Sequence, residues 1–139
     1  MKGLEKLLGR VGLFGGLSSR ELKEVAQAGR EMEFRAGNVI VERGLQGMDF
    51  YLILDGQARL DVPKKKSRVL GPGDYFGEIS VLDGGPRTAT ITAETHVLAF
   101  RLSRPQAVKL LDRHGAMGRK ILVEMCGRLR HAESRMSPE

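Results

Sequence analysis

The sequence has one cysteine, no tryptophan and only 5% aromatic residues. Because Cys126 has no second thiol in the chain, it forms no internal disulfide and builds no zinc site alone, and a reducing cytoplasm is its simplest environment. Apolar residues still make up 41% of the 139 positions, which is enough for the core of one domain. That core must be built mostly from aliphatic side chains.

Long apolar runs are also missing. The sequence has no apolar run of about 18 residues, which predicts that no segment spans a membrane. Residues 1–10 alternate lysine, glutamate and leucine, and they lack the apolar stretch of a secretory signal. We therefore expect a cytoplasmic protein without a membrane partner.

Charge of one sign is in moderate excess, with 23 Lys and Arg against 17 Asp and Glu and a net charge of +6. The basic residues are dispersed between a stretch at 64–68 and the region after residue 113. This distribution favours solvated faces of a soluble protein over a nucleic-acid interface.

The sequence falls into three zones. Residues 1–30 have helical periodicity, with Ser18 and Ser19 before Glu21 as an N-cap and Gly29 as a stop. Residues 31–102 contain six or more short apolar or alternating runs, the first four of them separated by glycines. The runs lie at Phe34, 39–41, 50–54, 58–62, 88–93 and 97–102. Such a series predicts antiparallel strands in a sandwich or barrel. The chain is thus expected to be mainly β with flanking helices.

Residues 103–135 return to helical periodicity. Ser103 can cap a first helix, which Gly115 ends, and a second helix is expected from Ala116 to about His131. In the second helix an apolar residue recurs every four positions, which predicts one stripe packed on the parent domain. This stripe consists of Met117, Ile121, Met125 and Leu129.

The segment 71–90 departs from the strand pattern, and its residues could form an anion-binding pocket. A single helical turn at about 78–82 would present unpaired backbone N–H groups, and Gly77 would let a ligand approach the backbone closely. Arg87 carries a planar fork suited to a phosphate. Glu78 would repel a phosphate, but it could accept a hydrogen bond from a neighbouring sugar hydroxyl. A ligand with both groups satisfies both residues.

The run Phe76-Gly77-Glu78, followed by Pro86-Arg87-Thr88-Ala89, resembles the phosphate-binding cassette of cyclic-nucleotide-binding domains. The resemblance extends through residues 34–44 and 50–56 and covers most of the chain, from about Leu13 to Leu129. It implies an antiparallel β jelly-roll barrel with N-terminal helices and C-terminal lid helices. The whole chain, 1–139, is then a single domain with its cassette at 76–89.

The resemblance also implies the roles of individual residues. Glu78 would accept from the ribose 2′-OH, Arg87 would pair with the cyclic phosphate, and backbone amides would complete the cradle. The ligand-binding residues that follow are Phe76, Gly77, Glu78, Ile79, Ser80, Pro86, Arg87, Thr88 and Ala89. The family closes its last helix over the base, and the candidates for that lid are Leu122, Met125, Cys126 and Leu129.

Several ligands fit this pattern. We expect cAMP, with cGMP as the alternative because the hydroxyl of Thr88 could bond the guanine amino group. A cyclic dinucleotide is a weaker alternative that rests only on the basic stretch at 64–68. The same fold could also be a ligand-free docking or dimerisation module, although the presence of both Glu78 and Arg87 argues against it.

The output of such a domain is expected to lie elsewhere. Transcription regulators of the family continue into a helix-turn-helix module, for which this sequence leaves no length, so we expect no DNA-binding module. An unknown protein effector, or a homodimer, would then carry the signal. Ligand binding would order the last helix, at 116–132, by its differential affinity for two states.

An enzyme of the cupin type is the alternative from a different class. Such small barrels hold a metal through clustered histidines and a carboxylate. His96, His114 and His131 lie far apart in the sequence, and no nucleophile–histidine grouping lies near the cassette. We therefore expect no enzyme, no metal and no cofactor other than the nucleotide ligand.

Overall fold

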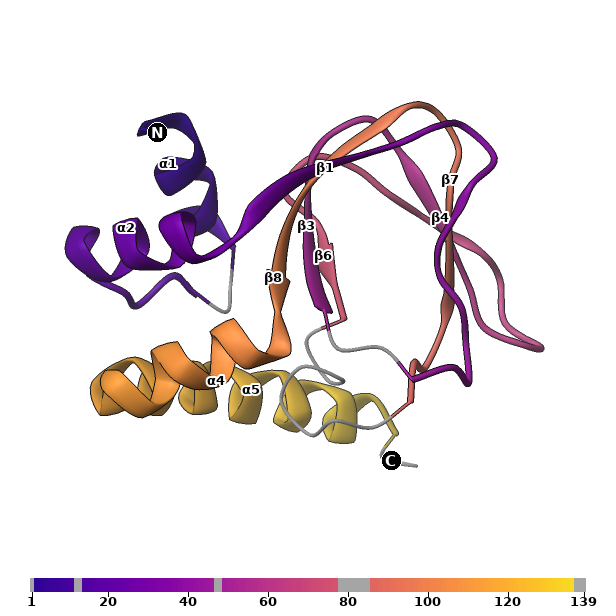
Figure 1. Ribbon diagram of the computed structural model, residues 1–139. Coiled ribbons are helices and arrows are strands. Elements are labelled where there is room, and N and C mark those ends of the chain that lie inside the picture. The colour runs from indigo at the N-terminus through magenta and orange to yellow at the C-terminus, as the bar shows by residue number, and fades with distance from the viewer. Residues whose placement is uncertain (1, 12–13, 47–48, 78–85, 137–139) are drawn as a thin grey trace. The chain divides into compact units, whose positions relative to one another are not determined.

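The computed structural model describes residues 2–11, 14–46, 49–77 and 86–136 (Figure 1). In this part of the chain the predicted order of helices, strands and helices is confirmed. The elements are α1 (Lys2–Arg10), α2 (Ser19–Ala28), β1 (Arg30–Phe34), β2 (Val39–Val41), β3 (Asp49–Asp55), β4 (Ala58–Asp61), β5 (Arg68–Leu70), β6 (Tyr75–Phe76), β7 (Thr90–Ala93), β8 (Val97–Ser103), α4 (Arg104–Arg113) and α5 (Gly115–Met136).

The chain divides into two compact units. One unit comprises Met1–Ala26 and Lys109–Glu139 and holds most of the helices, and the other comprises Gln27–Val108 and holds all the described strands. Each unit is described below by itself.

The strands of the second unit form two antiparallel four-stranded sheets within the described residues. The strand orders are β1-β8-β3-β6 and β2-β7-β4-β5 (Figure 1). Neighbours far apart in the sequence pair in both sheets, as β3 does with β8 and β2 with β7. The predicted fold class, mainly β with flanking helices, is confirmed. The expected barrel takes the form of two sheets, compatible with a jelly roll.

The core of this unit follows from the alternation of its strands. In β7 the residues Ile91 and Ala93 are buried while their neighbours are only half buried, as expected for a strand with one face on the core. One cluster of this core, within the described residues, is mostly aliphatic, as the composition predicts, with two aromatic rings among its members. This cluster contains Tyr51, Ile53, Ala58, Leu70, Phe76, Ile91, Ala93, Val97 and Ala99.

Two strands have no counterpart in the sequence-based expectation. These are β5, of three residues, and β6, of two residues, which are too short to show a period-2 pattern. Both form because a longer neighbour offers them backbone hydrogen-bonding groups, β4 for β5 and β3 for β6. The single helical turn expected at 78–82 lies outside the described residues.

The start of α2 is a capping box, as the sequence predicts. The Ser18 backbone N–H donates to Oε1 of Glu21 at 2.8 Å, and the Glu21 N–H donates to Oγ of Ser18 at 3.2 Å. The helix ends at Ala28, directly before the predicted stop at Gly29.

The C-terminal helices match their predicted places, with one correction. Oγ of Ser103 accepts from the backbone N–H of Gln106 at 3.4 Å, which supports the predicted cap. On α5, Met117 and Ile121 are buried, but Leu129 is 59% exposed. The expectation of one continuous packed stripe is therefore wrong for the second half of the helix. Among the described residues, no helix combines the length and apolarity that crossing a membrane requires.

Candidate functional site

Arg87 is a buried arginine whose backbone is fixed from both sides. Its N–H donates to the carbonyl of Leu45 at 2.9 Å, and its own carbonyl accepts from the N–H of Gly44 at 2.9 Å. The preceding residue, Pro86, forms an isolated antiparallel bridge with Gln46. The Arg87 side chain is left only 7% exposed. Because arginine is rarely buried without a charge-related role, this side chain marks a candidate site.

Gly77 lies against the guanidinium of Arg87. Its φ is +87°, a left-handed conformation, and a Cβ at this position would lie 2.7 Å from Nη1 of Arg87. The same Cβ would lie 2.4 Å from the carbonyl oxygen of Asp49. Only glycine combines this conformation with this space. The end of β6, the start of β3 and Arg87 therefore meet at one point.

Behind this point stands a small charged cluster on β3 and β8. Oδ2 of Asp49 lies 3.6 Å from Nε of Arg101, and Tyr51 is directly opposite Arg101 in the strand register. Burial raises the pKa of the Tyr51 hydroxyl, and the charge and hydrogen bond of Asp49 add to this effect, whereas Arg101 and Arg87 oppose it. The hydroxyl thus stays neutral between one carboxylate and two cations.

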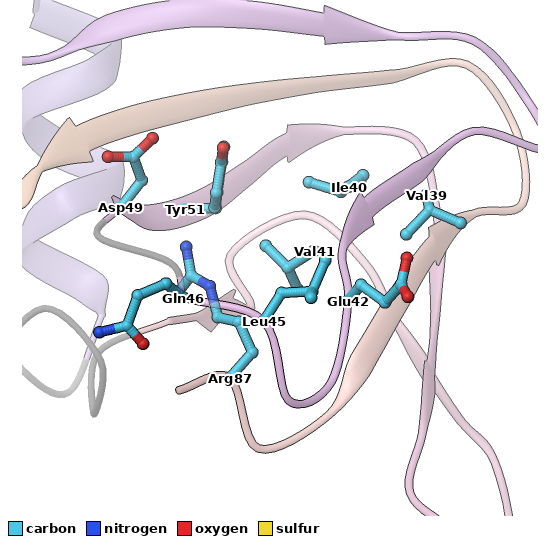
Figure 2. A pocket seen from close by; sticks show the side chains of 9 residues that line it. All are labelled: Val39, Ile40, Val41, Glu42, Leu45, Gln46, Asp49, Tyr51 and Arg87. Carbon is cyan, nitrogen blue, oxygen red and sulfur yellow. The ribbon is translucent and has the colours of Figure 1, made fainter. Parts of the chain in front are cut away.

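Beside Arg87 the second unit contains a cavity of about 500 Å³. Figure 2 shows Arg87 extending toward β3, where Asp49 and Tyr51 lie, with apolar side chains of β2 nearby. This volume is typical of small-molecule sites, which take about 300–1,000 Å³. A guanidinium beside apolar walls can bind a ligand that has both an anionic and an apolar part. The described lining residues are Val39, Ile40, Val41, Glu42, Leu45, Gln46, Asp49, Tyr51 and Arg87.

The structure brings together only part of the predicted cassette. Gly77 and Arg87 meet, whereas Phe76 is a core residue whose ring lies 5.2 Å from that of Tyr51. Pro86 and Thr88 are exposed and Ala89 is half-buried. The predicted Glu78, Ile79 and Ser80 lie outside the described residues.

The predicted lid residues all belong to α5, in the helical unit. Leu122 is 63% exposed, Leu129 and Cys126 are also exposed, and Met125 is half-buried. Their role as a lid stays a prediction.

Asp49, Tyr51 and Arg101 were not predicted as site residues. Asp49 was the available signal, since an acidic residue opens an otherwise apolar strand. Two of the three histidines that were expected to be isolated have a glutamate partner. Nε2 of His96 lies 2.9 Å from Oε1 of Glu33, and His114 pairs with Glu24. Within the described residues no three His, Cys, Asp or Glu side chains gather as a metal site would require.

Comparison with known proteins identifies the family. The sequence profile of the cyclic nucleotide-binding domain matches residues 31–114, more than half of the chain. The chain therefore belongs to the cyclic nucleotide-binding domain family, and the resemblance found in its sequence is confirmed.

A curated relative of the chain is a transcriptional regulator. The CRP-like cAMP-activated global transcriptional regulator of Mycobacterium tuberculosis is 24% identical over 139 residues, which cover 96% of this chain and 62% of the relative. This chain thus spans less than two thirds of the length of that curated relative.

Solved structures share the fold. The N-terminal domain of a transcriptional regulator from Streptomyces coelicolor matches with a TM-score of 0.82 and 28% identity, over 94% of this chain and 95% of that one. The Thermus thermophilus catabolite activator protein matches with a TM-score of 0.78 and 28% identity, over 90% and 61%. The regulatory domain of Toxoplasma gondii PKA, solved with cAMP, matches with a TM-score of 0.71 and 28% identity, over 78% and 43%.

Proposed function

We propose that this chain is a sensor domain that binds a cyclic mononucleotide, with cAMP preferred, and passes the signal to an effector protein. The observation that supports this most is the buried guanidinium of Arg87 held against Gly77. Both residues lie within the part of the chain that matches the family.

The ligand chemistry follows from these two residues and their neighbours. The fork of Arg87 binds the cyclic phosphate through charge-assisted hydrogen bonds, and Gly77 lets the phosphate approach the backbone. Glu78 accepts from the ribose 2′-OH. Backbone amides around Gly77, Ile79 and Ala89 complete the cradle. All of these roles are predictions from the sequence. The structure adds only that Gly77 and the guanidinium of Arg87 lie close together.

The preference for cAMP rests on relatives. The Mycobacterium tuberculosis regulator is described as cAMP-activated, and the Toxoplasma gondii domain was solved with cAMP. The alternative is cGMP, because the side chain of Thr88 is exposed and free to meet a guanine amino group. One such hydrogen bond changes affinity by about 0.5–1.5 kcal/mol, so the preference for cAMP would be modest.

The signal is proposed to reach a protein effector without chemistry of the domain's own. The family is one of regulatory binding domains, and the relatives named above are regulators. A cytoplasmic location fits a sensor of an intracellular nucleotide. The bound state would differ from the free state in α5, through the candidate lid residues of that helix.

The test is calorimetric titration of the whole chain with cAMP, cGMP and cyclic di-GMP, repeated on Arg87→Ala. We expect micromolar binding of cAMP, weaker or equal binding of cGMP, and a loss of at least tenfold in Arg87→Ala, because a buried charged hydrogen-bond donor is removed. Arg59→Ala is the matched control, since Arg59 is exposed and pairs with Asp61 and Glu94. Absence of heat with all three ligands, after removal of any co-purified nucleotide, would instead favour a docking module.

A further inference from the structure

The cluster behind Arg87 contains a carboxylate, Asp49, that has no role in the predicted cassette. Asp49 stands at the start of β3, and its carbonyl oxygen and Nη1 of Arg87 both lie within 3 Å of one point, the Cβ position of Gly77. Its carboxylate is one quarter exposed, so it is only partly screened by water. Asp49 and Arg87 line the same cavity, so the charge of this carboxylate would act on a phosphate bound to Arg87.

Two neighbours keep this carboxylate in place. Nε of Arg101 lies 3.6 Å from Oδ2 of Asp49, and the Tyr51 hydroxyl donates to the same side chain from two residues along β3. Alternate residues of a strand share a face, so Asp49 and Tyr51 point the same way, as Figure 2 shows. The buried Tyr51 ring packs against Phe34 and Phe76 and is thereby fixed.

The two kinds of phosphate ligand that could enter the site differ in their negative charge. A cyclic nucleotide is a phosphodiester with one negative charge. A 5′-nucleotide such as AMP is a phosphomonoester with about 1.5 to 2 negative charges at pH 7, because its second pKa is near 6. A fixed carboxylate beside the site repels the second ligand more strongly than the first.

We propose that Asp49 is a specificity-determining residue that selects the singly charged cyclic phosphate over phosphomonoesters of the same nucleoside. Arg101 and Tyr51 are positioning residues for Asp49. This inference rests on the proposed function, because it assumes that Arg87 binds the phosphate. Such selectivity would serve a sensor, because hydrolysis of the cyclic ester produces a phosphomonoester of the same nucleoside. A sensor of the cyclic nucleotide must not bind this product.

The experiment measures the dissociation constants of cAMP and 5′-AMP by calorimetry at low ionic strength, for the wild type and four variants. In Asp49→Asn the ratio of the AMP constant to the cAMP constant should fall about fivefold, because the repulsion is removed. In Arg101→Gln the same ratio should rise, because Asp49 loses its counter-charge. Tyr51→Phe should lower the ratio by less than Asp49→Asn. Urea unfolding of each variant shows that it is folded.

Asp61→Asn is the matched control. Asp61 is also a carboxylate on a strand paired with an arginine, since Oδ2 lies 2.9 Å from Nε of Arg59, and it is not among the cavity-lining residues. This variant changes the net charge by the same amount and should leave the ratio unchanged.

Three outcomes overturn the inference. An unchanged ratio in Asp49→Asn, with cAMP binding intact, overturns this inference alone. An equal fall of the ratio in Asp61→Asn shows that net charge, and not Asp49, sets the selectivity. If the wild type binds neither nucleotide, the proposed function is wrong and this inference is wrong with it. Should Asp49→Asn fail to fold, the direction of the change in Arg101→Gln decides.

Discussion

Replacement of Gly77 by alanine tests the geometry on which the candidate site depends. At Gly77 the backbone has a φ of +87°, and the added Cβ would lie 2.4 Å from the Asp49 carbonyl oxygen and 2.7 Å from Nη1 of Arg87. Real Cβ atoms are essentially never found under 3.0 Å from such neighbours, so either the backbone or the guanidinium must shift.

The magnitude follows from two separate effects. A left-handed alanine costs about 1–2 kcal/mol relative to glycine, and overpacking against a fixed backbone atom costs about 1–3 kcal/mol more. Gly37 isolates the first effect, because its φ is +91° and a Cβ there would meet nothing within 4 Å. Gly37→Ala and Gly77→Ala share the same change in unfolded-state entropy, which therefore cancels between them. We expect Gly77→Ala to be less stable than Gly37→Ala by about 1–3 kcal/mol.

The assay has two readouts. Urea unfolding followed by far-UV circular dichroism gives the free energy of unfolding of both variants and the wild type. Calorimetric titration with cAMP gives their affinities, which should fall at least tenfold in Gly77→Ala because Arg87 is displaced, and stay unchanged in Gly37→Ala. If Gly77→Ala is as stable as Gly37→Ala and binds cAMP as the wild type does, then Gly77 and Arg87 do not form the site described here.

Three further predictions concern the helices. Ser18→Ala should lower the free energy of unfolding by about 1 kcal/mol, through loss of the capping box, without changing cAMP affinity; a change in affinity would show that the capping box also contributes to nucleotide binding. The pKa of Glu21 lies below its ordinary value of 4.5, chiefly because of its hydrogen bond with the Ser18 N–H and then the Lys120 ammonium. Its contribution to stability is therefore present above pH 4.5 and lost as the pH falls through the lowered pKa, so the free energies of unfolding of the wild type and Glu21→Gln should converge as the pH is lowered below 4.5. Finally, cAMP should slow hydrogen exchange of the backbone over residues 116–132, and unchanged protection would show that α5 is not a lid.

The strands that coincide with an apolar run could be predicted from the sequence, and the strands without such a run could not. The run at 39–41 became β2 and the run at 50–54 became most of β3, because each carries its own apolar pattern. The two residues of β6 carry no such pattern, and they are a strand only because β3 lies beside them. In the second half of α5 the sequence pattern predicted too much. The apolar residues recur at helical spacing, but Leu129 is not buried.

The part of the candidate site whose residues lie close together in the sequence could be predicted. The part whose residues are brought together by strand pairing could not. Gly77 and Arg87 lie ten positions apart in one motif, and the structure places them in contact as expected. Tyr51 and Arg101 are 50 positions apart and face each other only through the register of β3 against β8. That register is set by the whole sheet, so the sequence offered Asp49 as a signal but no means of finding its partners Tyr51 and Arg101.

The most direct test of the central claim is a crystal structure of the whole chain with cAMP bound. The account predicts that oxygens of the cyclic phosphate lie about 3 Å from the guanidinium nitrogens of Arg87, close to the backbone at Gly77, with the ribose 2′-OH on the carboxylate of Glu78. A nucleotide bound elsewhere, or one whose phosphate does not touch Arg87, would contradict it.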